Sequence, residues 1–186
     1  MGRRRFIKNT LAVIVGGGLL LAPSSVQAVG KGLETIAGEG EKPVDDKARE
    51  IIDSFQGSGC YSRLENKDYD WVINNYQDDA NFLMEYNLEG LDEDRIETAG
   101  IMLNNVGTAL RKKGNCQDAI TYFKREVELD PNSLAGHGAL GFCHVKLRRW
   151  EDALREYKIT FNLCEDEGCR NHTSKYIQRI ESILNK

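Results

Sequence analysis

Apolar residues from position 95 onward recur at helical spacing in two successive stripes. The first stripe steps by three or four residues and comprises Ile96, Ala99, Leu103, Val106 and Leu110. The second comprises Ala119, Ile120, Phe123 and Val127. Gly114 and Asn115 separate the stripes, and an Asn side chain at that place can cap the following helix. The pattern predicts two amphipathic helices packed as an antiparallel hairpin.

The same arrangement returns further along the chain at one constant offset, the one that separates Gly107 from Gly141. The other matching pairs are Val106 with Leu140, Ala119 with Ala153, Phe123 with Tyr157 and Leu129 with Leu163. Gly107 and Ala119 fall where two antiparallel helices approach each other, so a larger side chain at either position would push the hairpin apart. Self-similarity at a constant offset of this size is the signature of a helical repeat array.

These residues resemble the tetratricopeptide repeat (TPR), whose 34-residue unit has the pattern W-x2-L-G-x2-Y, then A-x3-F, then P. The first unit provides Leu103, Val106, Gly107, Leu110, Ala119, Phe123 and Pro131 at these positions. The second provides His137, Leu140, Gly141, His144, Ala153 and Tyr157. Both units depart from the pattern at the Trp and Tyr positions, and the second has Glu165 where the proline belongs.

The resemblance implies an all-α, TPR-like array of helical hairpins, with repeats over residues 95–133 and 134–167. Because such arrays usually need at least three units to bury their apolar faces, we expect closing elements at both ends. The pattern of residues 168–186 predicts a capping helix that begins at Asn171 or Thr173. Residues 44–94 predict helices over 45–56 and 68–86, as either a helical extension or a degenerate third repeat.

Residues 1–28 have the pattern of an export signal. Arg3–Arg5 and Lys8 precede the apolar segment Leu11–Ala22, and Val26–Ala28 has the small-x-small form of a cleavage site. A membrane anchor is the alternative, although the apolar segment is shorter than the roughly 17–25 residues that span a bilayer. The four glycines and the proline of residues 29–43 predict a flexible leader.

The basic start of this segment, from Gly2 to Lys8, resembles the twin-arginine (Tat) motif. It departs from the motif at Gly2, where Ser or Thr is usual. The resemblance implies export of a folded chain, into the bacterial periplasm or, alternatively, the thylakoid lumen. An ordinary Sec signal remains the other interpretation.

The chain beyond residue 28 is acidic. Of the 25 Lys and Arg residues, four lie in residues 1–28, which contain no acid. The remainder therefore has 21 basic and 29 acidic residues, a formal charge of −8. Such a surface repels phosphate backbones and anionic lipids, which argues against nucleic acid as a partner. We expect membrane contact only through a protein partner.

The five cysteines divide into a candidate disulfide and three further thiols. Cys164 and Cys169 bracket an acidic loop between two predicted helices, and we expect them to pair in an oxidising compartment. Cys116 and Cys143 lie within the hairpins, where a buried free thiol is expected. Cys60 lies in a glycine-rich bend and is expected to be the most exposed thiol. Spacing does not fix any pairing among these three.

The sequence offers little catalytic chemistry. His137 and His144 share a helix face next to Cys143, which suggests either a metal site or packing histidines, and their repeat positions favour packing. No Cys-x-x-Cys motif, phosphate-binding glycine loop or serine nucleophile motif is present in the sequence. We therefore expect no enzyme, no cofactor and no metal.

In TPR proteins the first helix of each hairpin lines a concave groove that binds a peptide or a partner helix. The resemblance places in this groove Ile101, Asn104, Thr108, Arg111, Lys112, Ala135, Gly138, Phe142, Val145 and Lys146. This mixture of small, apolar and basic residues would suit an extended segment with some acidic character, with Phe142 as an apolar anchor. The other interpretation is that these side chains only stack on neighbouring helices.

The function expected from these features is protein–protein interaction. An exported adaptor, or an assembly or stability factor, would serve a periplasmic or lumenal complex, such as a redox or photosynthetic one. A permanent structural subunit of a membrane-associated complex is the alternative. A thiol-dependent or metal-dependent enzyme is the third class.

Overall fold

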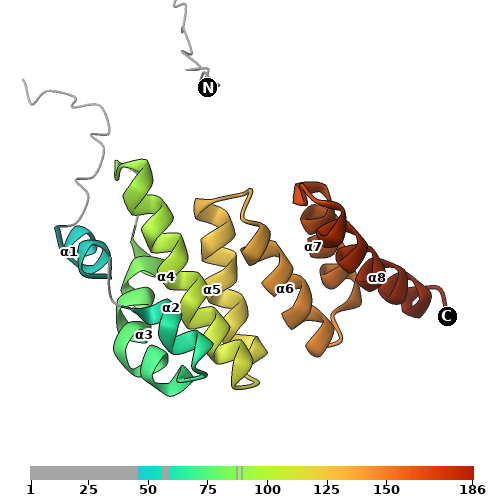
Figure 1. The fold of residues 1–186 in the computed structure, drawn as a ribbon, viewed down its shortest axis with the longest axis horizontal. Helices are drawn as coiled ribbons and strands as arrows, with labels where there is room; N and C mark the ends of the chain where they lie inside the picture. The colour runs from blue at the N-terminus through green and yellow to red at the C-terminus, as the bar shows by residue number, and fades with distance from the viewer. Residues whose placement is uncertain (1–45, 56–58, 87, 89) are drawn as a thin grey trace, which may run out of the picture. The chain divides into compact units, whose positions relative to one another are not determined.

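The computed structural model describes residues 46–55, 59–86, 88 and 90–186. Within this part the protein is all-α, which confirms the predicted fold class, and Figure 1 shows its helices. They are α1 (Asp46–Phe55), α2 (Cys60–Glu65), α3 (Tyr69–Glu85), α4 (Glu93–Lys112), α5 (Cys116–Leu129), α6 (Leu134–Lys146), α7 (Trp150–Leu163) and α8 (Glu167–Leu184). The predicted export signal and leader lie outside the described residues.

Two antiparallel hairpins, α4–α5 and α6–α7, form the centre of the array, and α5 packs on α6 to stack one hairpin on the next. Helices α5 and α7 begin at Cys116 and Trp150 and end at Leu129 and Leu163. Helices α4 and α6 end at Lys112 and Lys146. Each of these pairs has the same offset as Gly107 and Gly141, so the period of the sequence is also a period of the helix boundaries.

In each hairpin a glycine of the first helix packs against an aromatic ring of the second helix. A Cβ atom added to Gly107 would lie 2.8 Å from Cε1 of Phe123. A Cβ added to Gly141 would lie 3.1 Å from the ring of Tyr157. The first of these distances is too short for a real contact, so α4 depends on glycine to approach α5 this closely. The other residues assigned to hairpin packing are all buried: Leu103, Val106, Leu110, Ala119, Leu140 and Ala153.

Short polar side chains begin four of the helices. Asp92, Asn115, Ser133 and Asp166 accept hydrogen bonds from the backbone N–H groups of Arg95, Asp118, Gly136 and Cys169, respectively. These bonds satisfy donors that the first turn of a helix leaves unpaired. The sequence prediction that α8 begins at Asn171 or Thr173 is wrong, because Asp166 caps the helix and Glu167, the last acidic residue of the predicted loop, begins it.

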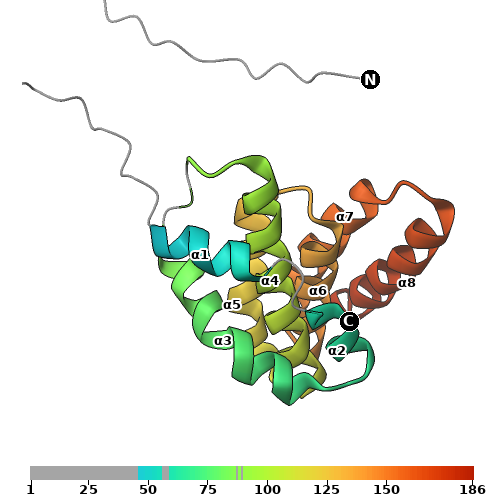
Figure 2. The ribbon, with the colours of Figure 1, turned by 60° about the vertical axis from the view of Figure 1, so that its left-hand side comes forward.

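Helices α1, α2 and α3 cover the side of α4 that the first hairpin leaves open. Helix α3 packs along α4, and α1 and α2 each contact both α3 and α4 (Figure 2). The ring of Phe55 meets Tyr76 edge-on with centroids 5.1 Å apart, which joins α1 to α3. The short helix α2 was not predicted. It starts after Gly59, whose φ of 67° lies in the left-handed region that favours glycine.

Helix α8 closes the other end of the array by packing on α7. The rings of Tyr157 and Tyr176 stack with centroids 4.8 Å apart, and Ile180 is buried. Cys164 and Cys169 form a disulfide with a Cα–Cα separation of 5.6 Å. The disulfide joins the residue that ends α7 to the first turn of α8.

Candidate partner-binding groove

The first hollow on the face of α4 has a volume of about 610 Å³ and lies between α2, α4, α5 and the start of α6. Its large apolar lining residues are Tyr61, Ile96, Ile101 and Leu129. Tyr61 and Ile101 are unusually open for large apolar residues, at 69% and 46% exposure. Its acidic lining consists of Glu93, Glu97, Glu126 and Asp130. This end of the face therefore combines apolar surface with carboxylates.

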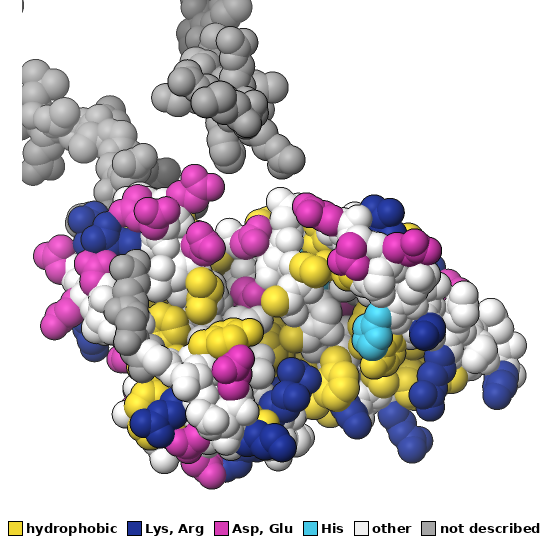
Figure 3. All heavy atoms as spheres, in the orientation of Figure 1, with side chains coloured by type: hydrophobic (Ala, Val, Ile, Leu, Met, Phe, Trp, Pro, Cys, Tyr) yellow, Lys and Arg dark blue, Asp and Glu magenta, His cyan; other side chains and the backbone are white. Residues whose placement is uncertain are grey.

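The second hollow, of about 390 Å³, lies between α4, α6 and α8. Its lining includes Arg111 from α4, Phe142 from α6, and His172 and Tyr176 from α8. Asn104 and Ala135 line both hollows, so the two are neighbouring parts of one surface depression. We refer to the two hollows together as the groove. Figure 3 shows hydrophobic side chains gathered in the middle of this face of the molecule.

Glu126 joins three helices beneath the point where the two hollows meet. Asn104 Nδ2 of α4 donates a 2.8 Å hydrogen bond to Glu126 Oε2. Ser133 Oγ, at the start of α6, donates a 2.6 Å bond to Glu126 Oε1 and accepts from the backbone N–H of Gly136. Burial raises the pKa of the Glu126 carboxyl, although these two hydrogen bonds act in the opposite direction. Glu126 therefore holds α4 and the start of α6 at a fixed distance from each other, although burial of its carboxylate costs desolvation free energy.

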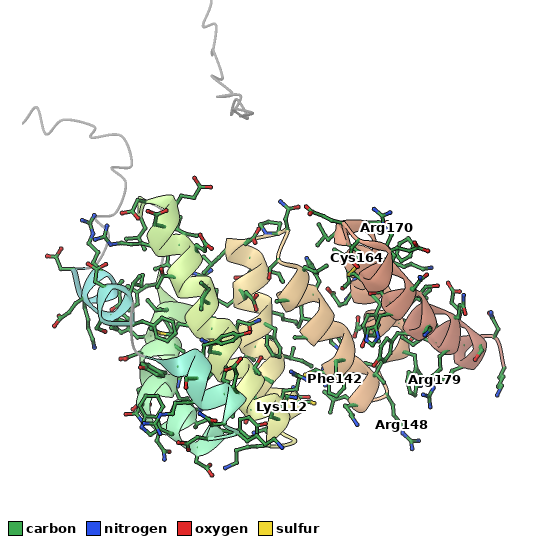
Figure 4. The ribbon with its side chains drawn as sticks, viewed as in Figure 1. Lys112, Phe142, Arg148, Cys164, Arg170 and Arg179 are labelled. Atoms are coloured by element: carbon green, nitrogen blue, oxygen red, sulfur yellow. A yellow bond between two sulfur atoms is a disulfide. The ribbon has the colours of Figure 1, made fainter. Side chains whose placement is uncertain are left out.

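Phe142 forms a flat apolar surface between two cations. The Arg111 guanidinium carbon lies 5.0 Å from the ring centroid of Phe142, and the Lys146 Nζ lies 5.3 Å from it. Such cation–π contacts hold the cations close to the ring without neutralising their charge. Figure 4 places Phe142 near Lys112, toward the end of α4 where the chain turns into α5. The arrangement can bind an apolar side chain next to an acidic one.

Most of the residues that the resemblance places in the groove line it in the structure. Seven line one or both hollows: Ile101, Asn104, Thr108, Arg111, Ala135, Gly138 and Phe142. Lys146 contacts the ring of Phe142 without lining either hollow. Lys112 is exposed outside both hollows, and Val145 packs on the cluster formed by Ala153, Tyr157 and Ile180.

Several groove residues were not predicted from the sequence. Tyr61 belongs to α2, which was itself not predicted, and His172 and Tyr176 reach the groove from α8. Glu126 lies on α5, the second helix of its hairpin, which the resemblance does not assign to the groove. The one available signal for Glu126 was a carboxylate placed next to Val127 at the end of a predicted apolar stripe.

The three cysteines outside the disulfide are all buried, so the expectation of an exposed Cys60 is wrong. The first turn of α2 holds Cys60 against the core, where it is 2% exposed. Burial raises the pKa of the Cys60 thiol to about 11 and that of Cys143 to about 12. Because the thiolate is the nucleophilic form, neither thiol is activated.

The two helix-α6 histidines are buried in different ways. His137 Nδ1 lies 2.8 Å from Glu156 Oε2, and its Nε2 lies 3.2 Å from the carbonyl oxygen of Pro131. His144 Nδ1 has no hydrogen-bond partner among the residues that the structure describes, and burial lowers the pKa of this imidazole. Within the described ranges, no group of three or more His, Cys, Asp or Glu side chains is arranged to hold a metal ion.

Comparisons with protein-family models and with curated proteins found no match to this chain. In the part of the chain that the structure describes, no helix is both long and apolar enough to cross a membrane. A function for the chain is therefore inferred from the groove and the repeated hairpins.

Proposed function

We propose that this chain is an exported TPR-type interaction module that holds a segment of a protein partner in the groove. The observation that carries the proposal is the extent of the groove across α4, α6 and α8, with apolar side chains at Ile101 and Phe142 open to a ligand. Grooves that bind peptides combine such apolar anchors with polar groups at fixed positions. The module acts as an adaptor, or as an assembly or stability factor, for a larger complex.

The assignment to the tetratricopeptide class is supported by two features. The boundaries of α5 and α7 repeat at the offset that separates Gly107 from Gly141, which is the length of the TPR unit. The glycine of each first helix lies against an aromatic ring of its second helix, at Gly107 with Phe123 and at Gly141 with Tyr157. These are the positions at which the sequence resembles the family.

The proposed location is the bacterial periplasm, with the thylakoid lumen as the alternative. The pattern of residues 1–28 supports export, and the Cys164–Cys169 disulfide supports an oxidising compartment. The proposed setting is a redox or photosynthetic membrane complex, by association with the twin-arginine export route. In this proposal the chain contacts the membrane only through its partner.

We propose a binding role in preference to an enzymatic one. The raised pKa values of Cys60 and Cys143 keep these thiols protonated at neutral pH, which disfavours nucleophilic catalysis by either. The Glu126 carboxylate of the groove accepts hydrogen bonds from Asn104 and Ser133, and these bonds hold neighbouring helices together. The groove thus has features for binding, and this carboxylate has a structural role.

A matched pair of variants tests the proposal. Ile101 lies in the groove and Leu184 at the end of α8, and both are large apolar residues with open side chains. We expect Ile101→Asp to abolish capture of a partner from the native membrane fraction, because a charge replaces apolar contact surface. Leu184→Asp should capture as wild type does. Circular dichroism checks that both variants keep their helix content.

The outcome also decides whether the groove is the binding surface, and whether the chain is an adaptor or a permanent subunit. Equal capture by both variants would rule out the groove as the binding surface. If Ile101 is required, the stoichiometry of the purified complex decides between an adaptor and a permanent subunit. A subunit remains at one copy per complex, whereas an assembly factor is substoichiometric and absent from the mature form.

A further inference from the structure

Three of the helices that line the groove, α4, α6 and α8, point the same way. In Figure 1, α4 and α6 begin near the top of the helical array and end near its bottom, and α8 runs obliquely from the top toward the lower right, because the second helix of each hairpin returns the chain between them. Acidic residues favour the first turn of a helix and basic residues the last. Parallel helices therefore place like charges at the same end of the face that they share.

Helix α4 follows that rule at both ends, whereas α6 has no acidic residue in its first turn and α8 has no basic residue in its last. Helix α4 begins with Glu93 and Asp94 and ends with Arg111 and Lys112, and α6 has Lys146 in its last turn. Figure 3 shows acidic side chains along the upper edge of the face and Lys and Arg side chains mostly along the lower edge, with hydrophobic side chains between them. The acidic charge of the groove is thus at one end and the basic charge at the other.

The charges at the two ends of the groove are available to a ligand. Among the described residues, Glu93 and Glu97 at the acidic end form no ion pair, and neither do Arg111 and Lys146 at the basic end. The neighbouring Lys113, outside the groove, pairs with Asp70 of α3. Arg111 Nε is buried and has no hydrogen-bond partner in the part of the chain that the structure describes. Lys146 borders the groove through its contact with Phe142. Carboxylates and cations that lie in or beside a cleft and form no ion pair favour a ligand of opposite charge.

The separation of the two ends sets the length of a suitable ligand. Glu93 and Arg111 stand 18 positions apart on α4, which at a rise of about 1.5 Å per residue places them about 27 Å apart along the helix axis. An extended chain covers this distance with about eight residues, at roughly 3.3 Å each. Ile101 lies between the two ends on the same helix, and Phe142 lies beside Arg111.

We propose that the groove selects an extended partner segment of about eight residues that carries opposite charges at its two ends. Its basic end lies against Glu93 and Glu97, its acidic end lies between Arg111 and Lys146, and its apolar centre contacts Ile101 and Phe142. The proposal rests on the proposed binding function and defines the chemistry of the partner. It also sets the orientation of the segment, since reversal would place like charges together at both ends.

Selection from a library of random twelve-residue peptides displayed on phage tests the proposal with the purified chain as bait. The expected enriched peptides carry Lys or Arg in one half, Asp or Glu in the other, and apolar residues between them. A labelled consensus peptide should bind at least tenfold more weakly at 0.5 M than at 0.05 M salt, because exposed charge pairs are screened.

Two variants address the ends separately, and a third controls for net charge. Glu93→Lys with Glu97→Lys should remove the preference for the basic half and weaken the consensus peptide at least tenfold. Arg111→Gln with Lys146→Gln should remove only the preference for the acidic half. Glu85→Lys with Glu151→Lys makes the same charge change as the first pair at exposed sites on α3 and α7, and it should leave the selection unchanged.

The failures can be told apart. Enriched peptides of uniform charge, or peptides that both end variants enrich equally, would overturn the charge-segregated ligand. No enrichment at all, or enrichment unaffected by Ile101→Asp, would instead overturn the proposed function. Sedimentation of the chain alone tests whether a second copy of the chain occupies the groove. A dimer that Arg111→Gln with Lys146→Gln dissociates would assign the groove to a second copy and overturn the proposal.

Discussion

The absence of a side chain at Gly107 sets the spacing of the first hairpin. The ring of Phe123 fills the space that a methyl group would occupy, at 2.8 Å from the added carbon. Gly100, two turns earlier on the same helix, has no atom within 4 Å of an added Cβ. Two glycines of one helix therefore have opposite consequences for stability, and only the packing against Phe123 distinguishes them.

Replacement of each glycine by alanine tests this difference. We expect Gly107→Ala to lower the free energy of unfolding by about 1–3 kcal/mol, because the ring of Phe123 must move. Gly100→Ala should raise it by about 0.5–1 kcal/mol, since alanine is the better helix former. Urea unfolding of both variants measures the changes. Equal effects at the two sites would contradict a close approach at Gly107.

Glu126 connects protonation to stability. Burial raises its pKa in the folded protein, so the folded state binds a proton more readily than the unfolded state does. Its contribution to stability is then fully present below the unfolded pKa of about 4.3 and is lost as the pH rises through the raised folded pKa. At neutral pH the buried carboxylate is a net cost to folding, despite its bonds to Asn104 and Ser133.

A Gln at this position keeps an acceptor for Asn104 and offers a donor to Ser133 without ionising. We expect Glu126→Gln to be more stable than wild type at pH 7, with the difference closing as the pH falls toward 4. Urea unfolding across this range measures it, with the exposed Glu85→Gln as the control. If the difference in the free energy of unfolding between the variant and wild type widened as the pH fell, the ionised carboxylate would be stabilised in the folded protein.

A disulfide and an aromatic stack are two of the contacts that attach helix α8 to the array. The Cys164–Cys169 bond closes a short loop, and the stacked rings of Tyr157 and Tyr176 lie about two turns further along α8. The bond restricts the unfolded chain next to α8, which leaves the helix positioned to cover the end of the second hairpin.

Reduction of this bond should loosen α8. In the chain-entropy description, a loop of this length contributes about 2 kcal/mol. We expect dithiothreitol to lower the free energy of unfolding by about that amount and to speed amide exchange in α8. The Cys164→Ser, Cys169→Ser double variant should show no response to the reductant. A response equal to that of wild type would attribute the effect to the buried thiols Cys60, Cys116 or Cys143.

The helices of the two hairpins were predictable because their apolar stripes and their glycines repeat. Helix α2 was not, because its six residues are fewer than two helical turns and cannot establish a period. The start of α8 was misplaced because an acidic run is also typical of a loop, and only the bond from the Cys169 N–H to Asp166 identifies the cap.

Half of the groove could be anticipated for the same reason. The α4 and α6 linings follow from the repeat, as for Asn104 and Phe142. Tyr61, Glu126 and His172 depend on how neighbouring helices meet across the groove, and that arrangement has no local signature in the sequence. Glu93 and Glu97 lie on α4 but were missed, because the resemblance assigns no residue before Ile101 to the groove. The expected ligand was therefore given some acidic character and an apolar anchor, but no basic end.

The core of the array is divided unevenly. One large buried cluster extends from α1 to α6, whereas Ala153, Tyr157 and Ile180 form a separate small cluster around α7 and α8. A repeat array gains stability from the interfaces between neighbouring units, so its ends can open before its centre does. The smaller cluster marks α7 and α8 as the end with less buried apolar surface to hold it closed.

Native-state hydrogen exchange should show this order. We expect amides of α7 and α8 to exchange at a lower opening free energy than those of α4 and α5, measured in increasing denaturant below the unfolding transition. Amides of all four helices that follow a single curve at every denaturant concentration would show one cooperative unit instead.

His137 of α6 ties the connection between the two hairpins to helix α7, since its two ring nitrogens lie close to the carbonyl oxygen of Pro131 and the carboxylate of Glu156. Arg149, at the start of α7, donates a 2.7 Å hydrogen bond to Gln117 Oε1 of α5, and rotation of the second hairpin about the first would break this bond. The pitch between successive units is thereby fixed by directional bonds as well as by shape. A partner that spans α4 and α6 accordingly meets a surface whose twist is already set, and none of its binding free energy is lost in aligning the two units.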